Sequence, residues 1–114
     1  MLECLVDGEI SDRIPASDRG LNYGDGLFET LAVFGGTPRF WQGHVDKLSA
    51  GCEQLGLPVT PQAVLLREVQ TVSAGQPKSV VKIMVTRGSS GMGYPAESPP
   101  RANRIVSSWP WPGD

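Results

Sequence analysis

Residues 60–87 have the sequence TPQAVLLREVQTVSAGQPKSVVKIMVTR, in which a helix pattern is followed directly by a strand pattern. Apolar residues at three- and four-residue spacing predict a helix that Thr60 caps, that has Pro61 at its first position, and that ends at Gly75. From Ser79 to Arg87 apolar and polar residues alternate, which predicts a strand with one buried face. The predicted apolar stripe of the helix consists of Leu65, Val69 and Val72.

The flanking sequence predicts further strands and a second helix. The expected elements are a hairpin over residues 2–10 that turns at Asp7-Gly8, a strand buried on both faces over 27–34, a helix over 43–55 that Gly56 ends, and a strand over 104–109. Residues 11–26 are rich in turn formers and are expected to hold no helix. The predicted class is α+β: a two-layer sandwich of an antiparallel or mixed sheet with two helices on one face.

Composition excludes several kinds of function. A length of 114 residues fits one domain, and 10 basic against 12 acidic residues give a net charge of −2, which argues against a nucleic-acid partner. No apolar run approaches the roughly 18 residues of a membrane span. A single histidine and two distant cysteines, Cys4 and Cys52, argue against a metal site and for reduced thiols in a cytoplasmic protein.

Two patterns are candidates for binding an anion. His44 and Lys47 lie three residues apart on one face in the first turn of the predicted helix, where the helix dipole favours negative charge. Arg87 precedes a glycine- and serine-rich stretch whose backbone amides can approach a carboxylate. Taken alone, these patterns are more typical of a solvated helix face, with His44 packed on Trp41, and of a long connection between strands.

Three segments together resemble one enzyme family. The string DRGLNYGDGLFET at residues 18–30 resembles a signature of the fold-type IV pyridoxal-phosphate enzymes, and within them of the 4-amino-4-deoxychorismate lyases. Residues 44–48, HVDKL, resemble the family's His-x-x-Arg-Leu helix, and residues 87–94, RGSSGMGY, resemble the lyases' Arg-Gly-x-Gly-Gly-Arg-Gly-Tyr loop. The resemblance extends over the chain from about Leu5 to Trp109.

The resemblance implies which part of a two-domain enzyme this chain corresponds to. Residues 1–109 correspond to the small N-terminal domain of a two-domain enzyme, residues 110–114 begin the interdomain linker, and the C-terminal domain that brings the catalytic lysine is absent. The chain alone is therefore expected to have no catalytic residue and no activity. The full enzyme is expected to be a homodimer that uses pyridoxal 5′-phosphate on a small-molecule substrate. The implied site residues are Lys47 for the cofactor, and Tyr23, Phe28, Arg87 and Tyr94 for the substrate.

Two departures from the family pattern leave the reaction open. Lys47 replaces an arginine that grips the cofactor phosphate, and a lysine keeps the charge without the forked geometry. Met92 replaces an arginine that would hold a substrate carboxylate. The implied reaction converts aminodeoxychorismate to 4-aminobenzoate and pyruvate. The alternatives are a branched-chain or D-amino-acid aminotransferase, and a non-catalytic module that self-associates.

Overall fold

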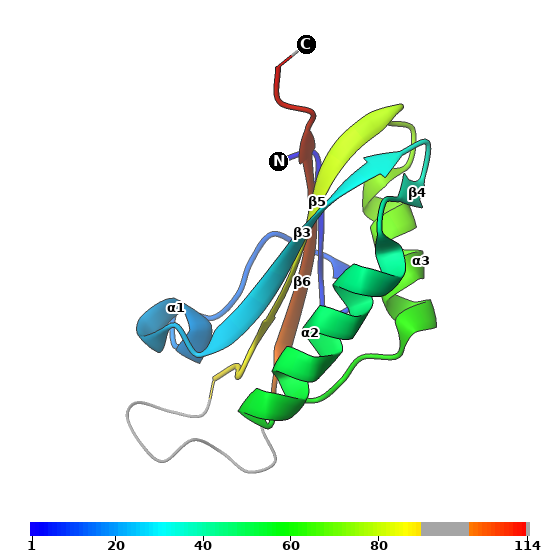
Figure 1. Cartoon of the computed structure of the whole chain (residues 1–114). Coiled ribbons are helices and arrows are strands. Elements are labelled where there is room, and N and C mark those ends of the chain that lie inside the picture. Colours follow the sequence, from blue (N-terminus) through cyan, green and yellow to red (C-terminus); the bar gives the residue numbers. More distant parts are fainter. Residues whose placement is uncertain (90–100, 114) are drawn as a thin grey trace.

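A computed structural model describes residues 1–89 and 101–113, so the predicted site residue Tyr94 lies outside the described residues, as does Met92. All strands of the six-stranded sheet pair antiparallel, in the order β2-β1-β6-β5-β3-β4 (Figure 1). The elements along the chain are β1 (Glu3–Val6), β2 (Glu9–Ile10), α1 (Arg19–Tyr23), β3 (Gly26–Phe34), β4 (Thr37–Pro38), α2 (Trp41–Leu55), α3 (Gln62–Ser73), β5 (Lys78–Thr86) and β6 (Asn103–Pro110). The predicted α+β class is confirmed, and the sheet is antiparallel.

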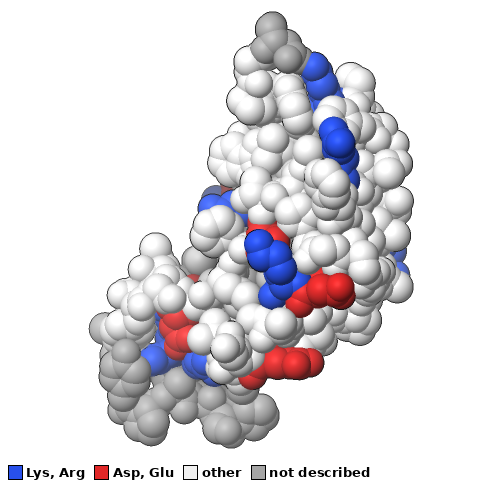
Figure 2. All heavy atoms as spheres, in the orientation of Figure 1, with Lys and Arg blue, Asp and Glu red and all other residues white. Residues whose placement is uncertain are grey.

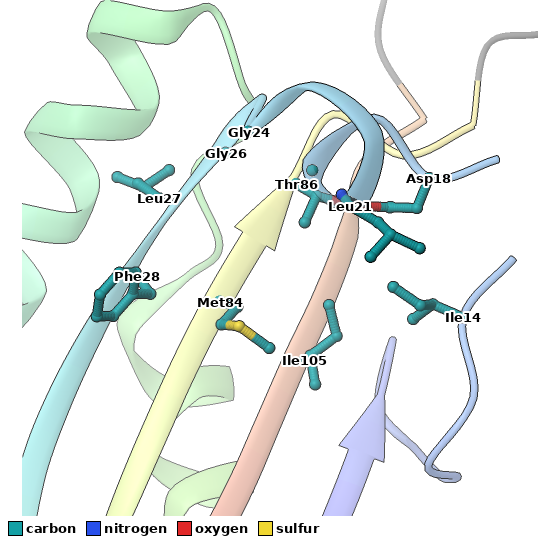
Figure 3. Close-up of a pocket in the computed structure, with 11 residues that line it drawn as sticks. Ile14, Asp18, Leu21, Gly24, Gly26, Leu27, Phe28, Met84, Thr86 and Ile105 are labelled. Atoms are coloured by element: carbon teal, nitrogen blue, oxygen red, sulfur yellow. Dashed lines mark hydrogen bonds between the residues drawn. The ribbon is translucent and has the colours of Figure 1, made fainter. Parts of the chain in front are cut away.

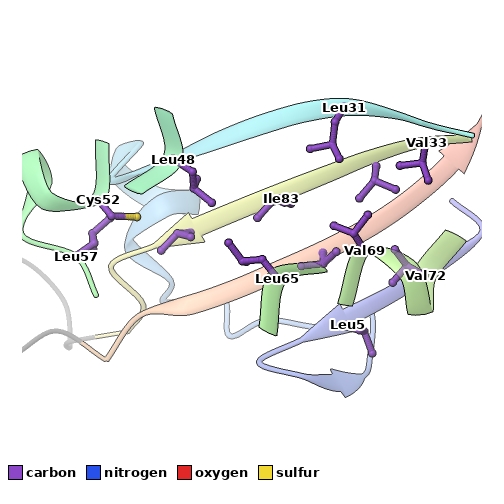
Figure 4. Close-up of a cluster of buried hydrophobic side chains, with 13 residues drawn as sticks. Leu5, Leu31, Val33, Leu48, Cys52, Leu57, Leu65, Val69, Val72 and Ile83 are labelled. Atoms are coloured by element: carbon purple, nitrogen blue, oxygen red, sulfur yellow. The ribbon is translucent and has the colours of Figure 1, made fainter. Parts of the chain in front are cut away.

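The helices α2 and α3 pack on the same face of the sheet and enclose the core (Figures 1 and 4). Val81, Ile83 and Val85 of β5 point into this core, as the alternation in the sequence predicts. The intervening residues of β5 therefore face the opposite side, which neither α2 nor α3 covers. The core consists of Leu5, Leu31, Val33, Leu48, Cys52, Leu57, Leu65, Val69, Val72, Val81, Ile83, Val85 and Val106.

The expectation that residues 27–34 form a strand buried on both faces is wrong. In β3, Leu31 and Val33 are buried against the helices, whereas Phe28 is 58% exposed and Phe34 lies at the surface. The reason is that helices cover only one side of the sheet, so every second residue of β3 faces the bare side. We call this side the open face.

Three expectations about helices need correction. α2 begins at Trp41, two residues before the predicted start, and ends at Gly56 in the left-handed conformation as predicted. α3 begins at Gln62, with Pro61 as its cap residue, so Thr60 does not cap it. Residues 11–26, expected to hold no helix, contain the short helix α1.

The turn at Asp7-Gly8 is confirmed, because both residues have positive φ (52° and 85°) and join the paired strands β1 and β2. Among the described residues, no helix is long and apolar enough to cross a membrane. On the face shown in Figure 2, acidic and basic side chains are scattered without a continuous field of one sign.

Candidate functional site

A pocket of about 400 Å³ lies on the open face, where β3 begins and β5 ends (Figure 3). Such a volume is in the range of small-ligand sites, and most of the side chains around it are apolar. Its lining consists of Ile14, Asp18, Gly20, Leu21, Gly24, Gly26, Leu27, Phe28, Met84, Thr86 and Ile105.

Three adjacent strands form the floor of this pocket. Phe28 of β3 is the register partner of Met84 in β5, and Met84 is in turn the partner of Ile105 in β6. The side chains of Ile14 and Leu21, from the segment that carries α1, lie beside this floor, next to Ile105 and Thr86 (Figure 3). The pocket can therefore accept a flat apolar ring between the sheet and this segment.

Asp18 anchors that segment to the sheet. Its side chain is fully buried, and a buried carboxylate is tolerated only with hydrogen-bond partners. One oxygen, Oδ1, accepts from Thr86 Oγ1 at 2.6 Å and from Asn103 Nδ2 at 2.8 Å. The other, Oδ2, accepts from the backbone N–H of Leu21 at 3.1 Å, which caps α1. Asp18 thus ties α1 to the ends of β5 and β6.

A second carboxylate, that of Asp25, holds two arginines. Arg19 Nε donates to Oδ2 at 3.1 Å, and Arg87 Nε donates to Oδ1 at 3.1 Å and to Oδ2 at 2.9 Å. Burial opposes ionisation of Asp25, but the hydrogen bonds from Arg19 and Arg87 outweigh it and lower the pKa of this carboxyl. The Arg19 guanidinium also lies 4.9 Å from the ring centre of Tyr23. Asp25 therefore fixes the geometry of the turn between α1 and β3.

The predicted substrate residues do not all meet at the pocket. Phe28 lines it, and Tyr23 lies half-exposed on the adjacent helix α1. Arg87 directs its guanidinium to Asp25, and its Nη2 donates to the carbonyl of Leu55 at the end of α2. These contacts of Arg87 join the turn before β3 to the end of α2.

Lys47, the predicted phosphate residue, lies exposed on α2 and does not line the pocket. Because α2 begins at Trp41, Lys47 is in its second turn, beyond the strongest influence of the helix dipole. It forms no ion pair with any residue that the structure describes. Leu55, which Arg87 contacts, lies eight residues further, or about 12 Å along the helix axis.

Sequence reasoning missed the partner of His44. The imidazole Nδ1 lies 2.8 Å from Glu29 Oε1, so the polar partner of His44 is on β3. The available signal was Glu29 itself, because a carboxylate on an otherwise apolar strand needs a polar partner.

The pocket and Lys47 lie on opposite sides of β3. Both Phe28 and Leu27 line the pocket, but the Leu27 side chain extends towards α2, where a Cβ on Gly51 would lie 2.4 Å from its Cδ1. Gly51 is one turn after Lys47 on α2. β3 pairs with β4 only at Val33 and Phe34, so its edge beside the pocket is not covered by another strand. A ligand that crosses this edge can reach both sides.

Comparison with known proteins identifies the family. Residues 26–114 match the family model of the class IV aminotransferases. The chain belongs to the class IV aminotransferase family. A curated aminodeoxychorismate lyase from Vibrio harveyi is 30% identical over 89 residues, which are 78% of this chain and 33% of the lyase. A putative branched-chain-amino-acid aminotransferase from Methanocaldococcus jannaschii is 26% identical over 99 residues, or 81% of this chain and 34% of that protein.

Solved class IV structures share the fold. The 4-amino-4-deoxychorismate lyase of Pseudomonas aeruginosa is 41% identical and superposes with a TM-score of 0.84, over 96% of this chain and 40% of that one. The branched-chain aminotransferase of Escherichia coli gives the same TM-score and coverage at 18% identity, which shows a common fold alone. The chain thus spans about a third of the curated relatives it matches and 40% of these structures.

The residues of this class IV chain fit a phosphorylated ring in part. An exposed lysine without an ion-pair partner among the described residues is suited to a phosphate, and the apolar pocket is suited to a ring. Neither of the other two lysines lines the pocket: Lys78 lies over the Trp111 ring and Lys82 over the Phe28 ring. On this geometry, the described residues fit the binding of a phosphorylated ring.

Proposed function

We propose that this chain is the pocket-bearing N-terminal domain of a pyridoxal-phosphate-dependent aminodeoxychorismate lyase, which converts 4-amino-4-deoxychorismate to 4-aminobenzoate and pyruvate. The observation that carries the proposal is the 41% identity to the Pseudomonas aeruginosa lyase over 96% of the chain. The curated lyase relative at 30% identity supports it, since the aminotransferases compared above reach 26% and 18%.

Each part of the site has a role in this proposal. The bound cofactor supplies an electron-withdrawing ring that weakens a bond next to the substrate nitrogen. Lys47 binds the cofactor phosphate as a point charge, which neutralises it but orients it less than an arginine would. Phe28, Met84 and Ile105 pack against the substrate ring and exclude water from it. Asp18 and Asp25 keep the α1 segment in place above the ring.

The lysine that carries the cofactor is proposed to come from polypeptide outside these 114 residues. Lys47 is exposed on a helix, and Lys78 and Lys82 each lie over an aromatic ring. We therefore expect the chain alone to have no turnover. A homodimeric assembly and a cytoplasmic location stay predictions.

A chimera tests the proposed reaction. This chain replaces the corresponding domain of the Pseudomonas aeruginosa lyase, and the purified chimera is given cofactor and aminodeoxychorismate. The proposal expects equimolar 4-aminobenzoate and pyruvate. Lys47→Ala is expected to raise the cofactor concentration for half-maximal rate by about ten- to a hundredfold, since a charge-assisted contact contributes about 1.5–3 kcal/mol, while Lys47→Arg keeps it. A chimera that folds and binds cofactor but releases no 4-aminobenzoate contradicts the proposal.

The same chimera separates the alternatives. Transfer of the amino group from a branched-chain or D-amino acid to a keto acid, with no release of 4-aminobenzoate, would favour an aminotransferase. The Methanocaldococcus jannaschii relative motivates this alternative. The non-catalytic module is motivated by the exposed apolar side chains of the open face, among them Phe28 and Trp109. It predicts concentration-dependent self-association of the 114-residue chain and no activity in the chimera.

A further inference from the structure

A carboxylate of β3 lies on the side of the sheet that the helices cover. Glu29 is the one charged residue in β3, and its register partner on β5 is the core residue Ile83. The Glu29 side chain is 15% exposed, and its Oε1 lies 2.8 Å from Nδ1 of His44 on α2. A carboxylate with so little exposure needs a hydrogen-bond partner, so this contact joins α2 to β3.

The first turn of α2 has no side-chain cap. Phe40 precedes the helix in the left-handed conformation, with φ at 54°, and its side chain makes no capping hydrogen bond. Helix ends without such a cap are held in place by other contacts. Gln42 of this turn bonds to Gln62 at the start of α3, but these side chains are exposed. The partly buried contact between His44 and Glu29 therefore fixes this turn against the sheet.

Lys47 lies between two points at which α2 meets β3. His44 is three residues before it and Gly51 is four residues after it, so all three lie on one side of the helix. At Gly51 the helix comes so close to β3 that a Cβ would lie 2.4 Å from Leu27 Cδ1. At His44 the helix is bonded to Glu29, two residues after Leu27. These two contacts set the distance of Lys47 from the edge of β3 beside the pocket.

We propose that Glu29 is a positioning residue that, through His44, holds Lys47 where its ammonium meets the phosphate of a ligand crossing the edge of β3. This inference rests on the proposed function and adds to it the residue that places the phosphate-binding lysine. Glu29 forms no ion pair with Lys47 in the described part of the chain, so it acts through the helix. Lysine is a point charge on a flexible stem, so its contact with a phosphate depends on how firmly the backbone beneath it is placed.

Charge and position make opposite predictions for variants of Glu29. If the carboxylate acted only through its charge, it would repel a phosphate, and its removal would tighten binding. If it acts through His44, removing the side chain releases the first turn of α2 and weakens binding. Glu29→Gln separates the two effects, because its amide can bond to Nδ1 of either imidazole tautomer and carries no charge.

Titration of the 114-residue chain with pyridoxine 5′-phosphate, which has the ring and the phosphate but no aldehyde, tests the inference through amide chemical shifts. We expect saturable shifts around Lys47, and a dissociation constant about two- to tenfold higher for Glu29→Ala, the effect of one hydrogen bond. Glu29→Gln is expected to bind at least as tightly as the parent chain. Gln62→Ala removes the other contact of this turn and is the matched control, expected to leave affinity unchanged. In a Lys47→Ala background, Glu29→Ala is expected to have no further effect.

Three results would overturn the inference. The first is unchanged or tighter binding by Glu29→Ala. The second is an equal loss of affinity for Glu29→Ala in the parent chain and in the Lys47→Ala background. The third is absence of saturable shifts on α2 of the parent chain at millimolar probe. Spectral dispersion reports whether each variant folds, and His44→Ala, which removes the same bond, replaces Glu29→Ala if the latter does not.

The chimera distinguishes failure of this inference from failure of the proposed function. If the chimera releases 4-aminobenzoate and Glu29→Ala leaves its cofactor dissociation constant unchanged, the proposed function stands and the role of Glu29 is refuted. If Glu29→Ala weakens cofactor binding but the unaltered chimera releases no 4-aminobenzoate, the role of Glu29 stands and the proposed reaction is refuted.

Discussion

Asp25 is the residue whose loss tests the site architecture most sharply. Its carboxylate joins Arg19, whose side chain is 2% exposed, to Arg87, whose side chain is 16% exposed. Asp25→Asn keeps the shape of the side chain and removes the charge, so both guanidinium groups lose the negative charge of Asp25.

The loss of stability expected for Asp25→Asn depends on how deeply the ion pairs are buried. Removing one partner of a fully buried ion pair costs about 3–5 kcal/mol, because the other charge is left uncompensated. Asp25 itself is 19% exposed and the amide still accepts one hydrogen bond, so we expect a loss of about 2–3 kcal/mol in the free energy of unfolding. A loss of this size is a large part of the stability of a small domain.

The contribution of Asp25 to the free energy of unfolding depends on pH with a definite sign. The folded pKa of Asp25 lies below the ordinary value of 3.8, so folding favours its ionised form. Its contribution is therefore complete above about pH 4, and it declines as the pH falls from there through the lower folded pKa. In Asp25→Asn this acid-dependent component is absent.

Urea unfolding at neutral pH measures the loss of stability in Asp25→Asn, and urea unfolding between pH 2 and about 5 measures its acid-dependent component. The matched control is Asp12→Asn, since the side chain of Asp12 is 68% exposed and lies 3.8 Å from the exposed Arg13. Surface pairs of this kind contribute about 0–1 kcal/mol. If Asp25→Asn is no less stable than Asp12→Asn at neutral pH, the reasoning about the two-arginine contact is refuted.

Three further predictions concern packing and thiol chemistry. Gly20→Ala should destabilise the chain by about 1–3 kcal/mol, because a Cβ would lie 2.4 Å from Thr86 Cγ2. Gly43→Ala on α2 should stabilise it by about 0.5–1 kcal/mol, because a Cβ there meets no atom within 4 Å. Thermal unfolding of the two variants compares these effects. Leu65→Ala in the core should lower the free energy of unfolding by about 2–5 kcal/mol, whereas Leu55→Ala, at an exposed position, should change it little. Equal losses for the two variants in urea unfolding would contradict the placement of Leu65 in the core. Burial raises the pKa of the Cys52 thiol, so Ellman's reagent should modify it only as fast as the chain opens, and rapid modification of the native protein would argue against this packing.

Elements with a clear period were predictable from the sequence, and the open face was not. The alternation over residues 79–87 correctly placed Val81 and Ile83 in the core. The same argument did not reveal that β3 has a bare side, because its apolar residues at 28 and 34 look identical to core residues in a sequence. Exposed aromatic side chains at a ligand or domain surface break the usual alternation of apolar and polar residues.

The short helix α1 was missed for a physical reason. Five residues show no helical period, and its cap Asp18 depends on Thr86 and Asn103, which are 68 and 85 residues away in the sequence. Arg87 likewise bonds to Asp25 over a separation of 62 residues. Tertiary hydrogen bonds of this kind leave no local pattern, so the sequence suggested these polar residues as candidates but not their partners.

In the proposed enzyme, these 114 residues line the site for the cofactor and the substrate, and the lysine that bonds covalently to the cofactor lies in polypeptide outside them. The most direct test is borohydride reduction of the cofactor-loaded chimera, followed by peptide mass spectrometry of the label. The account predicts one stoichiometric phosphopyridoxyl group on a lysine of the part supplied by the Pseudomonas aeruginosa lyase. A stoichiometric label on Lys47, Lys78 or Lys82 instead would contradict it.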